Sequence, residues 1–168
     1  MGDQYHTLVL LRHAKSAWPA GVADHDRPLA PRGVREAGLA GDWLRANFPV
    51  VDAVLCSTAT RARETLARAA VDAPVRYVER LYGATTAEVI DEVNRVEDDV
   101  DTLLVVGHEP TISEVTIGLA GADGTNTAAV ERILAKFPTS AIAVLQVPCR
   151  WERLDLGDAA LLKFHVPR

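Results

Sequence analysis

Cysteine is scarce in this sequence, and long hydrophobic runs are absent. The 168 residues include two cysteines, Cys56 and Cys149, with no paired spacing between them. This usage argues against a disulfide framework and favours a reduced, cytoplasmic protein in which both thiols pack as small buried hydrophobes. No apolar stretch approaches the roughly 20 residues needed to span a bilayer, and no charged-then-apolar leader opens the chain. We therefore expect a soluble protein.

An excess of positive charge is also missing. The formal net charge at pH 7 is -5, which argues against nonspecific binding to nucleic acid and against attraction to an anionic membrane surface. The chain has no Gly-rich Walker loop and no Gly-x-Gly-x-x-Gly element after a strand, and its histidines lack the paired spacing of metal ligands. We predict no nucleotide or metal cofactor. The five histidines are His6, His13, His25, His108 and His165.

Apolar runs of strand length alternate with stretches of helical periodicity, which predicts an α/β fold. The length is typical of a single domain, residues 1–168, that can bury a core without a metal or a disulfide. Residues 18–31 are expected to form a loop, with 20–26 as a flap over the site. Strands are predicted at 7–11, 53–56, 75–78, 102–106, 141–147, 151–156 and 160–166, and helices at 31–47, 60–70, 87–96, 110–119 and 127–136.

Three of the predicted strands end in residues suited to phosphate. Arg12 and His13 follow the first strand, residues 57–61 follow the second, and residues 107–110 follow the run that ends at 106. Because the carboxyl ends of parallel strands share one edge of a sheet, we expect these junctions to converge on one crevice. Arginine offers a planar fork that matches phosphate oxygens, neutral imidazole can carry a phosphoryl group, and helix N-termini add partial positive charge. The pattern indicates a phosphate site.

The same junctions belong to five blocks that carry a family resemblance. They are residues 11–16 (Leu-Arg-His-Ala-Lys-Ser), 26–29 (Asp-Arg-Pro-Leu) with Arg32 and Gly33, 57–61 (Ser-Thr-Ala-Thr-Arg) with Ala62, Glu64 and Thr65, 106–110 (Val-Gly-His-Glu-Pro), and 136–139 (Lys-Phe-Pro-Thr). In order and content the blocks resemble the histidine phosphatase superfamily, which also contains the cofactor-dependent phosphoglycerate mutases. The match is closest to the short, SixA-like phosphohistidine phosphatase branch. The resemblance implies a three-layer αβα domain with a mainly parallel sheet, phosphoglycerate mutase-like with a minimal cap.

The resemblance also implies roles for individual residues. His13 would attack phosphorus and form a covalent phosphohistidine, which water then hydrolyses. Arg12, Arg61 and His108 would surround the transferred phosphoryl group, and Ser16 would donate a hydrogen bond to it. The competing interpretations are a solvated loop histidine for His13, a helix-surface arginine for Arg61, a buried histidine that caps a helix for His108 and a turn serine for Ser16.

The general acid is Glu79, Glu109 or no residue at all. Phosphoglycerate mutases of the superfamily supply a glutamate followed by Arg and then Tyr-Gly, and residues 79–83 (Glu-Arg-Leu-Tyr-Gly) resemble that element. Glu79 is equally well explained as a surface ion pair with Arg80, and Glu109 as a cap of the following helix. Imidazole departs easily from phosphorus once it is protonated, so a phosphohistidine phosphatase depends less on an acid.

The flap block is expected to have a structural role first. Asp26, Arg27 and Arg32 would organise the flap and its junction with the first long helix, with a secondary substrate contact from Arg27 as the alternative.

Taken together, these features predict a metal-independent phosphatase with catalytic residues His13, Arg12, Arg61, His108 and Glu79. Hydrolysis is favoured over mutase action because little extra chain lies between the second strand and Glu79 to build a cap, so the pocket should be open. An open pocket suits phosphohistidine on a protein, which is the favoured substrate, and equally a small phosphorylated metabolite. The alternatives are a small-metabolite or sugar-phosphate phosphatase, then a phosphomutase or a module that binds a phosphorylated ligand without turnover.

Overall fold

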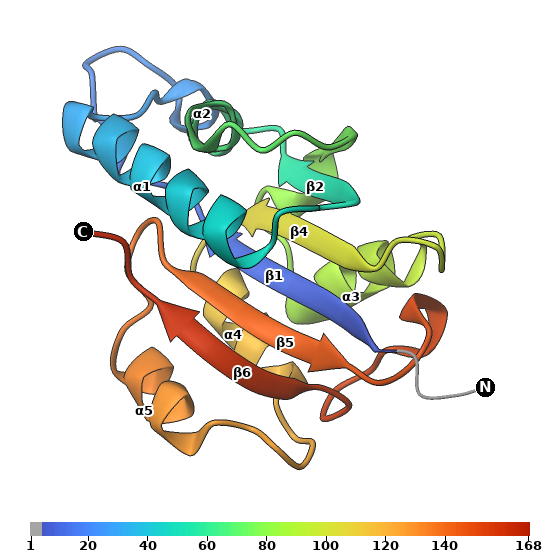
Figure 1. Ribbon diagram of the computed structural model, residues 1–168. Coiled ribbons are helices and arrows are strands. Elements are labelled where there is room, and N and C mark those ends of the chain that lie inside the picture. The colour runs from blue at the N-terminus through green and yellow to red at the C-terminus, as the bar shows by residue number, and fades with distance from the viewer. Residues whose placement is uncertain (1–4) are drawn as a thin grey trace.

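A computed structural model describes residues 5–168 of the chain and contains one six-stranded sheet with the strand order β3-β2-β4-β1-β5-β6 (Figure 1). Strand β1, which carries the Arg12 junction, lies in the middle of the sheet between β4 and β5. The strands are β1 (His6–Arg12), β2 (Ala53–Ser57), β3 (Val75–Val78), β4 (Thr102–Gly107), β5 (Ile142–Val147) and β6 (Ala160–His165).

The sheet is mainly parallel, as predicted. β1 pairs with β4, β4 with β2, and β2 with β3 in parallel, whereas β5 runs antiparallel to both β1 and β6. In the parallel part, the carboxyl ends of β1, β2 and β4 therefore meet at one edge. That edge is where open α/β sheets place their ligand sites.

Helices cover both faces of the sheet, which confirms the three-layer αβα architecture (Figure 1). Along β1 the side chains alternate between the faces: Val9 and Leu11 pack with the first two helices, and Leu8 and Leu10 pack with the others. This period of two is what a strand buried on both sides requires. The helices are α1 (Pro31–Asn47) and α2 (Thr60–Ala69) on one face, and α3 (Thr86–Asn94), α4 (Thr111–Leu119) and α5 (Thr127–Ala135) on the other.

The strand predicted at 151–156 was wrong. This segment begins with a short 3-10 helix, η3 (Trp151–Arg153), and continues into a turn. Trp151 is fully buried and its Nε1–H donates to the Val100 carbonyl at 2.8 Å. The Asn94 side-chain amide donates to the carbonyls of Trp151 and Leu154. Because a side chain satisfies these carbonyls, the apolar residues are buried without any strand pairing.

The expectation that both cysteines are buried holds for one of them. Cys56 is buried, as expected of a small hydrophobe, whereas Cys149 is only partly buried. In residues 5–168 no helix is long and apolar enough to cross a bilayer.

The loop before α1 contains a 3-10 turn, η1 (Asp24–Asp26), and this turn lies over the carboxyl edge of the sheet close to α2.

Candidate active site

His13 lies directly after β1, and its surroundings select one tautomer. The ring Nδ1 is 2.7 Å from the carbonyl oxygen of Ala14, so Nδ1 carries the proton and donates it. The Nε2 lone pair is then free. The turn is fixed to its neighbours because the His13 N–H donates to the Gly107 carbonyl and the Ala14 N–H to the Thr65 hydroxyl. His13 therefore presents a nucleophilic nitrogen on a rigid backbone.

The imidazole of His13 is held neutral. The pKa of His13 is lowered from 6.5 to about 3, chiefly by burial in the pocket. The Ala14 carbonyl opposes this shift, and the neighbouring His108, Arg61 and Arg12 add to it. Desolvation disfavours the charged form of a histidine, and nearby cations do the same. At neutral pH the ring is therefore in the state that a nucleophile requires.

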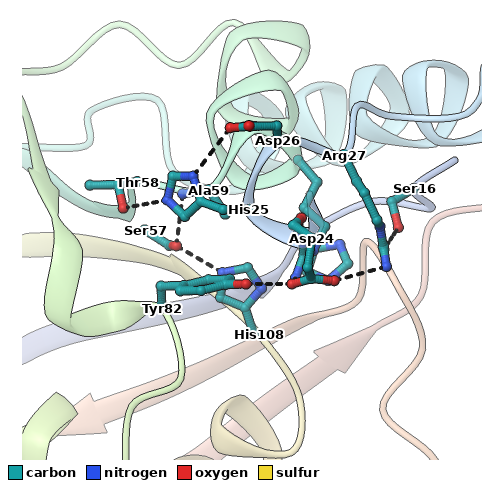
Figure 2. A network of polar contacts seen from close by, with 12 residues as sticks. Ser16, Asp24, His25, Asp26, Arg27, Ser57, Thr58, Ala59, Tyr82 and His108 are labelled. Carbon is teal, nitrogen blue, oxygen red and sulfur yellow. Dashed lines mark hydrogen bonds and ion pairs between the residues drawn. The ribbon is translucent and has the colours of Figure 1, made fainter. Parts of the chain in front are cut away.

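His108 follows β4, and its ring centroid lies 5.1 Å from that of His13. Its Nε2 is 2.8 Å from the hydroxyl oxygen of Ser57, which also accepts the N–H of Ala59 (Figure 2). Within residues 5–168, Nε2 is the only acceptor recorded for the Ser57 hydroxyl, so the hydroxyl proton is donated to it. Nδ1 of His108 then carries a proton. Burial, followed by the charge of Arg61, lowers the pKa of His108 to about 4.

The two arginines bring unused donors to the same place. Arg12 donates from one terminal nitrogen to the Phe137 carbonyl at 2.8 Å, and Arg61 donates to Asp24. In the described chain, the buried Nε groups of Arg12 and Arg61 and Nδ1 of His108 have no hydrogen-bond partner. Buried donors without partners are costly, and an anion would satisfy several at once. The arrangement fits a phosphoryl group.

The η1 turn supplies a carboxylate to this cluster. Asp24 accepts from Arg61 through its backbone oxygen at 2.7 Å and through Oδ2 at 3.1 Å, and Oδ1 accepts from Arg27 at 3.2 Å. The Tyr82 hydroxyl also donates to Oδ2, and Arg27 continues the network to the Ser16 hydroxyl (Figure 2). The hydrogen bond from Tyr82 and the two arginines hold the pKa of Asp24 below its ordinary value.

Comparison with known proteins places the chain in a family. Residues 8–85 match the family model of the histidine phosphatase superfamily (branch 1). A solved structure described as a putative phosphohistidine phosphatase SixA from Nakamurella multipartitia is 42% identical, with a TM-score of 0.88, over 97% of this chain and 96% of that chain. This chain belongs to the histidine phosphatase superfamily. Its SixA-like neighbours assign it to the short branch, and together with the fold they support a phosphatase function.

Other relatives extend this picture. An uncharacterized protein of Mycobacterium tuberculosis (strain ATCC 25618 / H37Rv) is 68% identical over 94% of this chain and 100% of its own length. A structure of the protein histidine phosphatase SixA complexed with tungstate is 23% identical, covers 96% of this chain and 97% of that chain, and has a TM-score of 0.77, so it shares the fold. The predicted membership of the SixA-like branch of the histidine phosphatase superfamily is confirmed.

The structure brings four of the predicted site residues together, namely Arg12, His13, Arg61 and His108. Ser16 is buried at the rim and its hydroxyl accepts a hydrogen bond from Arg27, which leaves its own proton free for a ligand.

The two candidate general acids, Glu79 and Glu109, lie outside this group of residues. Glu79 lies exposed in the 3-10 turn η2 (Glu79–Leu81), and in residues 5–168 its carboxylate has no hydrogen bond or ion pair. Glu109 accepts from the backbone N–H and the hydroxyl of Ser113 at 2.6 and 2.8 Å, so it caps the start of α4. Within residues 5–168 neither carboxylate forms a hydrogen bond or ion pair with the cluster around His13, although the charge of Glu109 acts on Arg12 and opposes the lowering of its pKa by burial.

Sequence reasoning missed three supporting residues. Asp24 is one of several acidic residues in the loop, and nothing local distinguishes it from Asp26. Ser57 and Thr65 belong to a block already noted, and their positions at the end of β2 and within the first turns of α2 were the available signal. Residues 5–168 hold no group of three or more His, Cys, Asp or Glu side chains arranged to bind a metal ion.

Proposed function

We propose that this histidine phosphatase hydrolyses phosphohistidine on a protein substrate through a covalent phosphohistidine at His13. The observation that carries the proposal is the state of His13: its Nδ1 is committed to the Ala14 carbonyl, Nε2 is free, and burial lowers the pKa of the ring to about 3. A neutral, oriented imidazole among cationic groups is suited to attack on an anionic phosphoryl group.

The reaction has two steps in this proposal. The Nε2 lone pair of His13 forms a bond to phosphorus while the bond to the leaving nitrogen breaks, and that nitrogen keeps the electron pair. Water then adds its oxygen to phosphorus and releases a proton, the bond to His13 breaks, and inorganic phosphate departs. Arg12, Arg61, His108 and Ser16 would bind the equatorial oxygens in both steps, where fixed donors stabilise the transition state.

The carboxylates favour a phosphoramidate over a phosphate ester. An ester oxygen requires a proton as it leaves, but Glu79 is exposed and unengaged and Glu109 is occupied by Ser113. A protonated imidazole departs without an acid. Two solved relatives described as putative phosphohistidine phosphatases agree with this preference. The proposal needs no metal, because His13 supplies the nucleophile and the arginines supply the positive charge.

A labelling experiment tests the covalent step. The protein is mixed briefly with a phosphohistidine-containing protein labelled with radioactive phosphate and quenched in alkali. We expect label on the enzyme that is stable in base and labile in acid, and none on the His13→Ala variant.

Steady-state release of phosphate from phosphohistidine, sugar phosphates and an aryl phosphate is then compared. Equal rates for wild type and His13→Ala would refute the proposal, and isomerised ester in place of free phosphate would indicate a mutase.

A further inference from the structure

Asp24 occupies a special position in the η1 turn, between the buried cations and solvent. Its side chain is 51% exposed, whereas the side chain of Arg61, which it contacts, is 9% exposed. His13, which neighbours Arg61 in the same cluster, is 7% exposed as a whole residue. The carboxylate therefore lies on the outer side of the cluster, and the nucleophile lies on the inner side.

The exposed position of Asp24 puts its carboxylate on the side of the site where the leaving group is expected. In an in-line displacement the attacking and leaving atoms lie on opposite sides of phosphorus. Because His13 attacks from the buried side, the leaving group lies on the solvent side, which is also where a protein-borne substrate must extend. Asp24 is then near the atoms that depart.

The carboxylate is also held firmly and in its charged form. Arg61 and Arg27 bind its two oxygens at 3.1 and 3.2 Å, and the Tyr82 hydroxyl donates to Oδ2 as well. Figure 2 shows Asp24 between Tyr82 and Arg27, beside the ring of His108. A carboxylate accepts about four hydrogen bonds, so one position remains for a donor on the substrate.

We propose that Asp24 selects the leaving group of the reaction by accepting a hydrogen bond from the distal ring N–H of a protonated phosphohistidine. The inference rests on the proposed function and deepens it. A fixed negative charge at this point stabilises an imidazolium and repels a leaving group that becomes an anion, such as a phenolate or an alkoxide.

The chemistry balances without an acid. In the bound substrate one ring nitrogen is bonded to phosphorus and the other carries a proton, so the ring is cationic. When His13 bonds to phosphorus, the P–N electron pair returns to the first nitrogen and the ring departs as neutral imidazole, with its proton still on the second nitrogen. Asp24 accepts that N–H throughout and gains no proton. The exposed Glu79 is not required.

The test compares two substrates with the Asp24→Asn variant. The probes are a phosphohistidine peptide and p-nitrophenyl phosphate, whose leaving group is an anion. We expect Asp24→Asn to lower kcat/KM for the phosphohistidine peptide at least tenfold more than kcat/KM for the aryl phosphate, because any loss that comes from Arg61 is common to both substrates. The matched control is Asp26→Asn, because Asp26 lies in the same turn and contacts only His25 among the charged groups of the described chain. It should leave the ratio of the two rates unchanged.

A purely structural role for Asp24 predicts something different. If Asp24 only positions Arg61, both substrates lose rate by the same factor, because Arg61 binds the phosphoryl group that they share; this result overturns the inference. The Asp24→Glu variant, which keeps the charge, should retain part of the preference, and thermal unfolding confirms that the variants fold. Wild-type protein that hydrolyses neither probe would overturn the proposed function itself, which is a separate outcome.

Discussion

At the residue scale, two histidines with the same intrinsic chemistry are given complementary roles by their hydrogen bonds. The Ala14 carbonyl holds the proton of His13 on Nδ1 and frees Nε2 to attack. The Ser57 hydroxyl donates to Nε2 of His108 and leaves Nδ1–H as a donor. A backbone acceptor and a side-chain donor thus suit His13 to its proposed role as nucleophile and His108 to its proposed role as a phosphate-binding donor, with the ring centroids 5.1 Å apart.

The burial of these rings predicts how stability depends on pH. The pKa of His13 is lowered to about 3 and that of His108 to about 4, so the unfolded chain binds protons at a higher pH than the folded chain does. The free energy of unfolding should therefore fall as pH drops from about 6.5 towards 4. Each unit of pKa difference corresponds to about 1.4 kcal/mol, so the two rings contribute on the order of a few kcal/mol.

Urea unfolding across this pH range measures the effect. The His13→Gln/His108→Gln variant should show a clearly shallower dependence between pH 6.5 and 4 than the wild type. An unchanged slope would mean that other groups control the acid sensitivity.

At the element scale, the contact of α1 with α2 depends on close approaches at glycine. Gly41 of α1 faces the carbonyl oxygen of Ala69 so closely that a Cβ on Gly41 would lie 2.0 Å from it. Gly33, at the start of α1, approaches the backbone of Lys15 in the same way. These two close approaches fix α1 against α2 and against the turn that carries His13.

A matched pair of substitutions in α1 tests this packing. Gly41→Ala should destabilise the protein by about 1–3 kcal/mol, because two backbones must separate. Gly38→Ala should stabilise it by about 0.5–1 kcal/mol, since a Cβ there meets nothing within 4 Å and alanine favours a helix. Denaturant midpoints compare the two. Similar effects of both substitutions would show that helix propensity, not close packing, dominates.

At the scale of the whole molecule, the parallel part of the sheet assembles a site from segments nearly a hundred residues apart. β1, β2 and β4 are neighbours in this sheet, and the junctions after them bring Arg12, His13, Arg61 and His108 to one edge. This assembly supplies the positive charge locally in a chain whose formal net charge is -5.

Because protein groups supply the charge, removal of divalent metals should have no effect on catalysis. We expect phosphate release from a phosphohistidine protein to keep its kcat after dialysis against EDTA. Re-addition of Mg²⁺ or Zn²⁺ provides the control. Loss of activity in EDTA that is restored by one of these ions would contradict the metal-independent reaction.

The sequence by itself determined the α/β order, most element boundaries and the residues at the strand ends, because these depend on local periodicity and on motifs contiguous in the chain. It misassigned residues 151–156, since Asn94 satisfies their carbonyls from a distant helix. Only the tertiary structure decided the tautomers of His13 and His108 and the selection of Asp24, from a loop with several acidic residues, as the partner of Arg61. Each of these depends on hydrogen bonds between segments far apart in the chain, which local patterns do not encode.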